Sequence, residues 1–358
     1  MASEFSRLKQ ELLAIVQANP DPSHAQALST VLNNLCKEGP LILARQQILV
    51  SLQFQSMGSR LDNIDEAHAS TYSWVFDPKL APDSNPVKFK TWAQEENGIY
   101  WITGKAGSGK STLMKFISIH PETREALRVW AGGKTLYTAS HYFWNPGSSM
   151  EKSQKGLFQT ILYDILRQCP ELIDRVCEER WEGGAVSHSA PWTLSELARS
   201  VKLLGQQMLL QNGSEICFCF FIDGLDEYEG DHEDIVKLLH DLTQSPNLKI
   251  CTSSRPWGVF IESFEGCSRA GNRLVIHEHT AKDIAAVVHN KLGPHLDRRQ
   301  KDRAEVEELV SEIVKKAEGV FLWVTLVMKE LVKSFRAADP ISLLRRRLDE
   351  IPSGQYPL

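Results

Sequence analysis

Residues 104–111 read Gly-Lys-Ala-Gly-Ser-Gly-Lys-Ser and match the pattern G-x-x-x-x-G-K-[ST] at every fixed position. They follow the apolar residues 99–102 and open a stretch with a helical pattern, residues 111–119. Glycines in such a turn let successive backbone N–H groups approach one anion, and the dipole of the following helix adds to the attraction. The stretch predicts a phosphate-binding P-loop between a strand and a helix, as in α/β proteins.

The residues of this loop have expected roles toward a nucleotide. Lys110 is expected to reach the β- and γ-phosphates, and the hydroxyl of Ser111 to bind Mg²⁺. A chance match in a glycine-containing turn is the alternative, and the strand–loop–helix context argues against it. The candidate nucleotide-binding residues are Gly104, Lys105, Ala106, Gly107, Ser108, Gly109, Lys110, Ser111 and Thr112.

A second acidic site follows another apolar run, residues 217–222. Asp223 comes directly after this run and is expected to hold Mg²⁺ with Ser111 through the water shell of the ion. Asp226 and Glu227 follow, and either could polarise the attacking water as a general base. The alternative, an acidic turn after a core strand, is less favoured once the P-loop is taken into account.

A third element lies at residues 249–257, Lys-Ile-Cys-Thr-Ser-Ser-Arg-Pro-Trp. A strand here would end in hydroxyls and Arg255 at the sheet edge where phosphates are expected. We therefore count Arg255 with Asp226 and Glu227 as a candidate catalytic residue that reports on the γ-phosphate. The alternative is a surface arginine before a proline turn.

Two motifs that would indicate binding of guanine are missing, so ATP and ADP are favoured over guanine nucleotides. A D-x-x-G pattern would need glycine where Asp226 follows Asp223. Residues 290–293, Asn-Lys-Leu-Gly, lack the aspartate of N-K-x-D. The predicted cofactors are therefore ATP or ADP and Mg²⁺.

Strand and helix patterns alternate through residues 98–279, which predicts a mainly parallel, doubly wound sheet. Thr193 and Glu196 form a capping box ahead of one predicted helix. The predicted strands are residues 99–102, 135–143, 216–222, 248–252 and 274–277, and the predicted helices are residues 111–119, 155–167, 194–210 and 234–242.

The flanking residues have helical patterns. We expect N-terminal helices within residues 4–55, including residues 23–37 and 41–54, and renewed helices after a start signal at Thr280 and Asp283. The predicted domains are a helical segment at 1–60, a connector at 61–97, an NTPase core at 98–279 and a truncated helical lid at 280–358.

Charge and hydropathy exclude several partners. The net charge of −5 argues against a broad nucleic-acid surface, and the basic residues 345–347 are interpreted as a solvated helix face. The start of the chain lacks the layout of a signal peptide, and the apolar residues 320–328 fall short of the ~20 needed to span a bilayer. These observations predict a cytoplasmic protein without a membrane span. The seven cysteines form no C-x-x-C pair and are expected to be reduced core thiols.

Three stretches together resemble the NACHT family of STAND-class P-loop ATPases, in particular the fungal NLR-like, nephrocystin-like proteins. They are residues 98–115, 221–227 and 252–257. Residues 67–76 resemble the segment that precedes the P-loop in that family, and residues 319–323 resemble its lid helix.

This resemblance implies a five-stranded sheet with the Arg255 strand between the P-loop strand and the Asp223 strand. It also implies ADP at rest, ATP on activation and self-association of the active state. The family normally continues into a winged-helix segment and a repeat array. Because this sequence ends after lid-like helices, we expect a truncated gene product or a protein without its own sensor.

The function predicted from these observations is an ATP-binding signalling switch with slow Mg²⁺-dependent hydrolysis, which makes homo-oligomers in the ATP state. The alternatives are a P-loop phosphotransferase, for which no acceptor constellation is found, and a nucleotide-independent scaffold. The intact Lys110, Ser111 and Asp223 count against a scaffold. Neither the activating signal nor a protein partner is indicated by the sequence.

Overall fold

The computed structural model describes residues 39–69, 71–80, 86–182, 185–186, 190–206, 209–210, 212–267, 272–296, 303–337 and 339–354. These residues belong to two compact units, one within Met1–Gln55 and Phe158–Leu204, the other within Ser56–Leu157 and Gly205–Leu358. The helix predicted at residues 41–54 is confirmed at 39–52, whereas the helices predicted within residues 4–37 lie outside the described residues. The predicted domain boundaries remain predictions.

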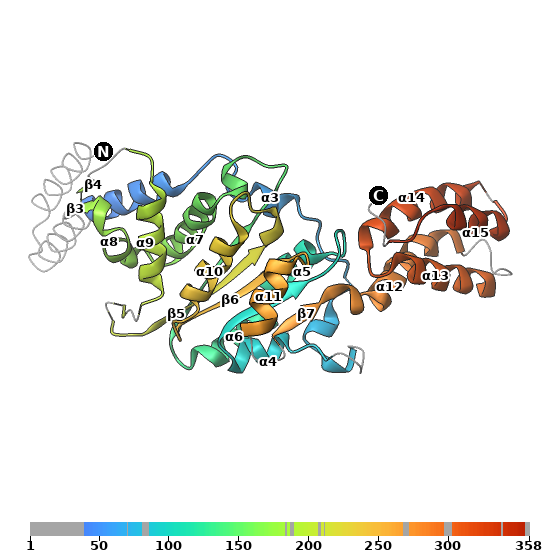
Figure 1. The fold of residues 1–358 in the computed structure, drawn as a ribbon, viewed down its shortest axis with the longest axis horizontal. Coiled ribbons are helices and arrows are strands. Elements are labelled where there is room, and N and C mark those ends of the chain that lie inside the picture. Colours follow the sequence, from blue (N-terminus) through green and yellow to red (C-terminus); the bar gives the residue numbers. More distant parts are fainter. Residues whose placement is uncertain are drawn as a thin grey trace, which may run out of the picture. The chain divides into compact units, whose positions relative to one another are not determined.

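A parallel sheet forms the centre of the second unit (Figure 1). Its five strands follow the order β2-β5-β6-β1-β7, and every neighbouring pair is parallel. The strand that leads to Arg255, β6, lies between the P-loop strand β1 and the Asp223 strand β5, so the predicted fold class and strand order are confirmed. The strands are β1 (Gly98–Thr103), β2 (Thr135–Tyr142), β5 (Ile216–Asp223), β6 (Leu248–Ser254) and β7 (Arg273–Val275).

The strands end close to their predicted positions because their apolar runs are short and bounded by polar residues. Every residue of β5 and β6 is buried, as expected of central parallel strands that are covered on both faces. The prediction for residues 274–277 is wrong at its end, since Ile276–Glu278 form a 3₁₀ turn. This turn redirects the chain toward the next helix.

Three helices share one hydrophobic cluster with the sheet. They are α4 (Phe89–Glu95), α5 (Lys110–Ile119) and α6 (Pro121–Ala131). The sequence did not predict α6, which begins where the His120 side chain accepts a hydrogen bond from the N–H of Glu122, with Pro121 in the first turn. The shared cluster includes Phe89, Trp92, Tyr100, Ile102, Leu113, Met114, Ile117, Leu127, Cys219, Phe221 and Cys251.

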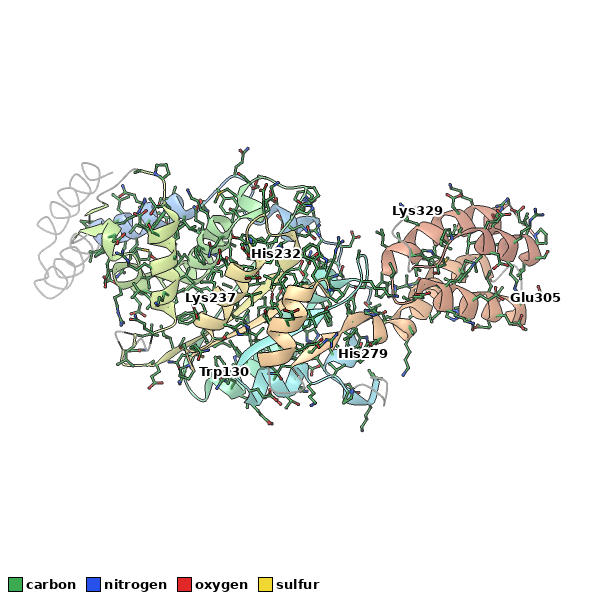
Figure 2. The ribbon with its side chains drawn as sticks, viewed as in Figure 1. Trp130, His232, Lys237, His279, Glu305 and Lys329 are labelled. Carbon is green, nitrogen blue, oxygen red and sulfur yellow. The ribbon has the colours of Figure 1, made fainter. Side chains whose placement is uncertain are left out.

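Lys249 is a fully buried cation within β6. Its Nζ donates to the carbonyl oxygens of Trp92 and Ala93, at 2.9 and 3.2 Å, in the last turn of α4. The same atom lies 4.2 Å from the ring centroid of Trp130, which Figure 2 labels on α6. A cation at a helix C-terminus satisfies carbonyls that have no partner within the helix, so Lys249 ties α4 to the sheet.

Two further helices complete this part of the fold, α10 (His232–Leu242) and α11 (Gly258–Cys267). Helix α7 (Gln154–Gln168) matches the prediction closely and crosses the boundary of the two units at Phe158.

The C-terminal helices are α12 (Ala281–Leu296), α13 (Arg303–Ala317), α14 (Phe321–Arg336) and α15 (Ile341–Glu350). They enclose their own hydrophobic cluster, in which the side chains of Trp323, Leu309, Ile313 and Leu344 are fully buried. The side chains of Arg345, Arg346 and Arg347 are 32%, 78% and 47% exposed, as predicted for a solvated face, and each pairs with an acidic side chain of these helices or their connections. We call residues 281–350 the lid helices.

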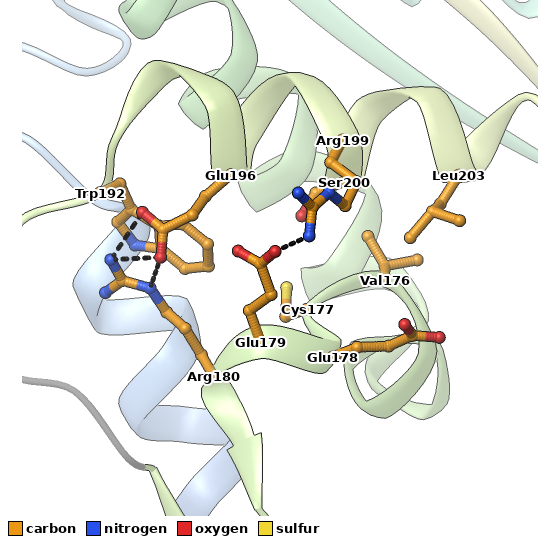
Figure 3. Close-up of a pocket in the computed structure, with 10 residues that line it drawn as sticks. All are labelled: Val176, Cys177, Glu178, Glu179, Arg180, Trp192, Glu196, Arg199, Ser200 and Leu203. Atoms are coloured by element: carbon orange, nitrogen blue, oxygen red, sulfur yellow. Dashed lines mark hydrogen bonds and ion pairs between the residues drawn. The ribbon is translucent and has the colours of Figure 1, made fainter.

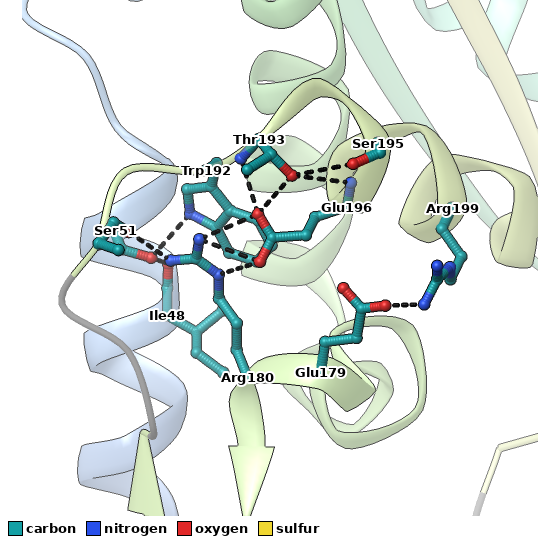
Figure 4. Close-up of polar contacts among 10 residues, drawn as sticks. Ile48, Ser51, Glu179, Arg180, Trp192, Thr193, Ser195, Glu196 and Arg199 are labelled. Carbon is teal, nitrogen blue, oxygen red and sulfur yellow. Dashed lines mark hydrogen bonds and ion pairs between the residues drawn. The ribbon is translucent and has the colours of Figure 1, made fainter.

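The first unit contains α8 (Ile173–Val176), α9 (Leu194–Leu204) and a short antiparallel pair, β3 (Trp181–Glu182) and β4 (Ala185–Val186). The capping box is confirmed: Thr193 N–H donates to Glu196 Oε2 at 2.7 Å, and Glu196 N–H donates to Thr193 Oγ1 at 3.2 Å (Figure 4). The predicted helix 194–210 is too long, since α9 ends at Leu204.

Arg180 is the buried cation of the first unit, with 2% of its side chain exposed. Its guanidinium pairs with Glu196 at 3.2 Å and lies 3.9 Å from the ring centroid of Trp192 (Figure 4). The adjoining cavity, which Figure 3 shows between Cys177, Arg180 and Leu203, has a volume of about 20 Å³. That volume holds about one water molecule, so the cavity is too small for a nucleotide.

Five cysteines have described side chains, and all five are buried and form no disulfide: Cys169, Cys177, Cys217, Cys219 and Cys251. This confirms the predicted core thiols, while the side chains of Cys36 and Cys267 lie outside the described ones. Among the described helices, none is both long and apolar enough to cross a membrane.

Candidate nucleotide-binding site

The predicted P-loop connects the end of β1 to the start of α5. Gly107 and Gly109 have φ angles of 69° and 92°, which favour glycine because other residues have a steric cost there. A Cβ atom on Gly107 would lie 2.7 Å from the Cβ of Leu322, and one on Gly109 would lie 2.4 Å from the hydroxyl of Tyr72. Both the loop conformation and its close neighbours therefore require glycine at these positions.

Lys110 folds back over its own loop. Its Nζ donates to the carbonyl oxygens of Gly104 and Lys105, both at 2.9 Å. Burial lowers the pKa of Lys110, and the charges of Asp226 and Asp223 oppose this effect. The structure thus holds a partly desolvated ammonium group where the motif predicts phosphate.

Asp223 ends β5 beside the P-loop and is 1% exposed. Ser253 Oγ donates to its Oδ1 at 2.5 Å and accepts from the N–H of Gly224 at 3.0 Å. Burial raises the pKa of Asp223, while hydrogen bonds from Ser111 and Ser253 and the charge of Lys110 oppose this. The structure therefore brings together Ser111 and Asp223, the residues predicted to hold the metal.

This set of atoms fits a Mg²⁺–nucleotide complex. A hydroxyl and a carboxylate are the hard oxygen ligands that Mg²⁺ prefers, and this ion usually takes its other ligands from water and phosphate. Among the described residues no group of three or more His, Cys, Asp and Glu side chains could hold a metal. The hydroxyl oxygens of Thr103 and Ser108 are buried without a hydrogen-bond partner among the described residues.

Asp226 and Arg255 form a pair at the same edge of the sheet. Arg255 Nε lies 3.0 Å from Asp226 Oδ2, and the backbone N–H of Arg255 donates to Asp226 Oδ1 at 3.0 Å. The side chain of Asp226 is 5% exposed and that of Arg255 is 47% exposed. Both oxygens of Asp226 are thus engaged, whereas the arginine retains N–H groups that face outward.

Glu227 is the third acidic candidate. Its Oε2 accepts a hydrogen bond from the backbone N–H of Asn145 at 2.9 Å. Burial raises the pKa of Glu227, the Asn145 hydrogen bond opposes this, and the charges of Asp223 and Asp226 add to the increase. A carboxylate with a raised pKa is a stronger proton acceptor, which suits a general base.

The lid helices contact the P-loop directly. The N–H of Leu322, in the first turn of α14, donates to the carbonyl of Gly107 at 3.1 Å. Lys105 Nζ lies 3.0 Å from Glu318 Oε2, so its side chain faces the lid helices rather than the loop. Gly319, just before α14, has a φ of 81° and lies close to His277. A Cβ atom at this position would be 2.4 Å from the carbonyl oxygen of His277, so the close packing requires glycine.

Tyr72 is a site residue that the sequence patterns did not single out. It has a φ of 65°, unusual for a non-glycine residue, and its hydroxyl donates to the carbonyl of Gly109 at 3.3 Å. Its N–H donates to Asp283 Oδ2 at 3.0 Å, and Trp74 Nε1 donates to the same oxygen at 2.8 Å. Tyr72 therefore links the segment before the P-loop to both the loop and α12.

The sequence prediction for Asp283 is wrong in one detail. Helix α12 begins at Ala281, as the start signal indicated, but Asp283 binds Tyr72 and Trp74 instead of capping its own helix. The ring of His279, labelled in Figure 2, stacks on that of Trp74 with centroids 5.0 Å apart. These tertiary contacts outweigh the local cap.

Comparisons with known proteins identify a family model and a curated protein that are similar to this chain. Residues 84–255 match the family model described as Nephrocystin 3, N-terminal. Vegetative incompatibility protein HET-E-1 of Podospora anserina is 25% identical over 279 residues, which cover 75% of this chain and 18% of that protein. The chain therefore spans less than a fifth of this curated relative.

A solved structure is also similar at a lower level. A chain in the structure of Drosophila ORC bound to DNA aligns over 69% of this chain and 53% of its own length, with 15% identity and a TM-score of 0.31. No functional argument follows from a similarity this low. The match to the family model and the similarity to the fungal protein confirm the resemblance stated from the sequence.

Proposed function

We propose that this chain is an ATP-binding signalling switch, because residues 84–255 match the family model described as Nephrocystin 3, N-terminal, and the chain resembles the NACHT-type P-loop NTPases. Slow Mg²⁺-dependent hydrolysis returns it to the ADP state, and the ATP state self-associates. The observation that carries the proposal is the convergence of Lys110, Ser111 and Asp223 at the carboxyl edge of the sheet.

Nucleotide binding uses the loop as the sequence motif predicts. The backbone N–H groups of residues 104–112 surround the phosphates, and Lys110 exchanges its two carbonyl partners for phosphate oxygens. Ser111 and Asp223 are the residues that would hold Mg²⁺, Ser111 through its hydroxyl and Asp223 through water. When bound, Mg²⁺ neutralises charge that develops on the phosphates.

Glu227 is the base in this proposal. Its raised pKa and its fixed hydrogen bond from Asn145 suit a carboxylate that takes a proton from water. Asp226 holds Arg255 at the sheet edge, and the free N–H groups of Arg255 reach the γ-phosphate. Loss of that phosphate then removes a partner of Arg255.

The contact between α14 and the P-loop supports the switch. The Leu322–Gly107 hydrogen bond and the Lys105–Glu318 ion pair involve the residues whose backbone binds phosphate. A ligand that binds better to one arrangement of loop and lid helices shifts the population toward that arrangement. The proposal therefore couples nucleotide state to the lid helices.

The nucleotide retained by the purified chain tests this proposal, together with mass by light scattering after addition of ADP or ATP with Mg²⁺. We expect retained ADP and an increase in mass with ATP. The Lys110→Ala variant should lose both, whereas Lys237→Ala, which removes an exposed lysine of α10, should retain both. Unchanged ATP binding in Lys110→Ala would contradict the assignment of the site, and an unchanged monomer with ATP would contradict the switch.

A further inference from the structure

Arg60 is a cation near the candidate site that lies outside every motif. It belongs to the short helix α3 (Ser59–Asn63), and its guanidinium carbon lies 5.7 Å from the ring centroid of Trp144. Its Nε is buried without a hydrogen-bond partner, and Arg60 makes no ion pair with another described residue. Arg60 as a whole is only partly buried, so the feature that calls for an explanation is its buried Nε, a donor without a partner.

Two side-chain hydrogen bonds hold the residues just before Arg60 in place. Ser59 Oγ donates to Glu151 Oε1 at 2.6 Å, and the hydroxyls of Ser56 and Ser148 are 2.8 Å apart. These bonds attach α3 to residues 144–151, the segment that follows β2. The guanidinium thus has a fixed location on the ring of Trp144.

Residues 144–151 also contact the acidic part of the site. Asn145, next to Trp144, donates its N–H to Glu227. Phe143, on the other side of Trp144, donates its N–H to the carbonyl oxygen of Asp223 at 3.0 Å. Trp144, which carries the guanidinium of Arg60 on its ring, therefore lies between two residues that are hydrogen-bonded to the acidic residues of the site.

The other cations of the site already have partners. Lys110 donates to two loop carbonyls, and Arg255 pairs with Asp226. A nucleoside triphosphate brings more negative charge than one Mg²⁺ neutralises, and the excess over a diphosphate lies on the γ-phosphate. The buried Nε–H of Arg60 has no hydrogen-bond partner among the described residues.

We propose that Arg60 binds the γ-phosphate of a nucleoside triphosphate, as a second arginine of the site in addition to Arg255. This inference rests on the proposed function of the site and extends it to a residue that distinguishes ATP from ADP. The guanidinium donates to phosphate oxygens from its place on Trp144, so α3 becomes part of the triphosphate site.

The alternative is a structural cation that only offsets Asp223 and Glu227. Its loss would weaken folding, or would weaken binding of ATP and ADP by the same factor. A γ-phosphate contact changes the ratio of the two affinities instead. The ratio therefore separates the two explanations.

The experiment measures the affinities of the full chain for ADP and for a non-hydrolysable ATP analogue, both with Mg²⁺, by calorimetric titration. Arg60→Gln should lower the preference for the ATP analogue over ADP about tenfold or more, the range expected for one charge-assisted contact. Arg60→Lys keeps the charge without the planar fork and should recover part of the preference. Arg128→Gln, which alters an arginine of α6 with 63% side-chain exposure, should match the original chain.

An unchanged preference in Arg60→Gln and Arg60→Lys, with ATP binding still dependent on Lys110, overturns the inference and leaves the proposed function standing. If the original chain binds neither nucleotide, both proposals fail. If Arg60→Gln does not fold, Arg60→Lys decides the question, because a folded lysine variant with an unchanged affinity ratio also overturns the inference.

Discussion

Leu322 donates its backbone N–H to the carbonyl oxygen of Gly107, 3.1 Å away, which joins the first turn of α14 to the middle of the P-loop. The two residues are far apart in the sequence, and their hydrogen bond uses main-chain atoms only. Substituting the leucine side chain would therefore leave the hydrogen bond in place. A test of this contact has to change the backbone or the space around it.

The Gly107→Ala substitution tests this contact by adding a methyl group between the P-loop and α14. The new Cβ would lie 2.7 Å from the Cβ of Leu322, at a residue with φ of 69°. We expect a loss of about 2 to 4 kcal/mol in unfolding free energy, from steric overlap and backbone strain together, measured by urea denaturation. Gly133→Ala is the matched control, because its φ is 94° but no atom lies within 4 Å of the new Cβ. Equal losses in the two variants would show that α14 does not constrain the loop.

Asp223→Asn tests the metal function of the site. The amide keeps the shape of the side chain and its hydrogen bond from Ser253, but it removes the charge that orients Mg²⁺. Nucleotide affinity with Mg²⁺ should fall about tenfold or more, while the affinity measured in EDTA should change little. Asp349→Asn, at a side chain with 78% exposure, is the control. An equal loss with and without Mg²⁺ would assign Asp223 a structural role.

The burial of Lys249 predicts that it contributes an increase of stability with pH in part of the alkaline range. Burial lowers its pKa from 10.5 to about 8. Between these values the unfolded chain keeps the proton that the folded chain has lost, so stability rises with pH. Cys217 and Cys219 act in the opposite direction around pH 9 and above, because burial raises their pKa values to about 11 and 12.

The informative window is pH 8 to 9, where Lys249 loses its proton in the folded chain. The thiols of the unfolded chain, with an ordinary pKa of 9, already titrate in this window, so the effect of Lys249 is measured as a difference between variants. The unfolding free energy of the original chain should rise there by about 1 kcal/mol more than that of Lys249→Met. Lys237→Met, at an exposed lysine, should keep the slope of the original chain. Parallel curves for the original chain and Lys249→Met would mean that Lys249 titrates normally when folded.

Glu196 predicts a loss of stability in acid. Burial alone would raise its pKa, but hydrogen bonds from Thr193 and the bonds and charge of Arg180 lower it to about 2. A carboxyl whose pKa is lower in the folded state stabilises the fold above its unfolded pKa, and this stabilisation disappears as pH falls from about 4.5 to 2.

The expected loss from this group is about 2 kcal/mol over that range, less than the full shift implies because the carboxylate keeps some contact with solvent. Glu196→Gln should remove this part of the acid dependence and lower stability at neutral pH, since Arg180 is left buried without its counter-ion. Urea denaturation at several pH values measures both effects. An unchanged acid dependence in Glu196→Gln would show that the pair contributes little.

The sequence was sufficient for the P-loop and the central strands because both are local signals. The motif at residues 104–111 has fixed spacing, and the apolar run before Asp223 needs no partner to be recognised. Strand order came from the family resemblance, since no local pattern specifies which strands become neighbours. The sheet confirms that order.

Residues that join the site through tertiary contacts could not be predicted in this way. Tyr72 and Arg60 precede the loop by a long stretch of chain, and each acquires its place only when distant segments pack together. Asp283 shows the same limitation, because a buried contact with Trp74 replaced the helix cap that its local sequence indicated. A left-handed backbone at Tyr72 leaves no mark in the amino-acid pattern.

The strand order has a consequence for how the chain is made. Strand β1 pairs with β6 and β7, so both of its neighbours leave the ribosome after more than a hundred further residues. Until residue 254 has emerged, the strand that carries the phosphate-binding loop has no hydrogen-bonded partner, and its apolar edge is available to chaperones or to aggregation. Nascent chains arrested before β6 should therefore be unable to retain nucleotide, although they already contain the whole motif.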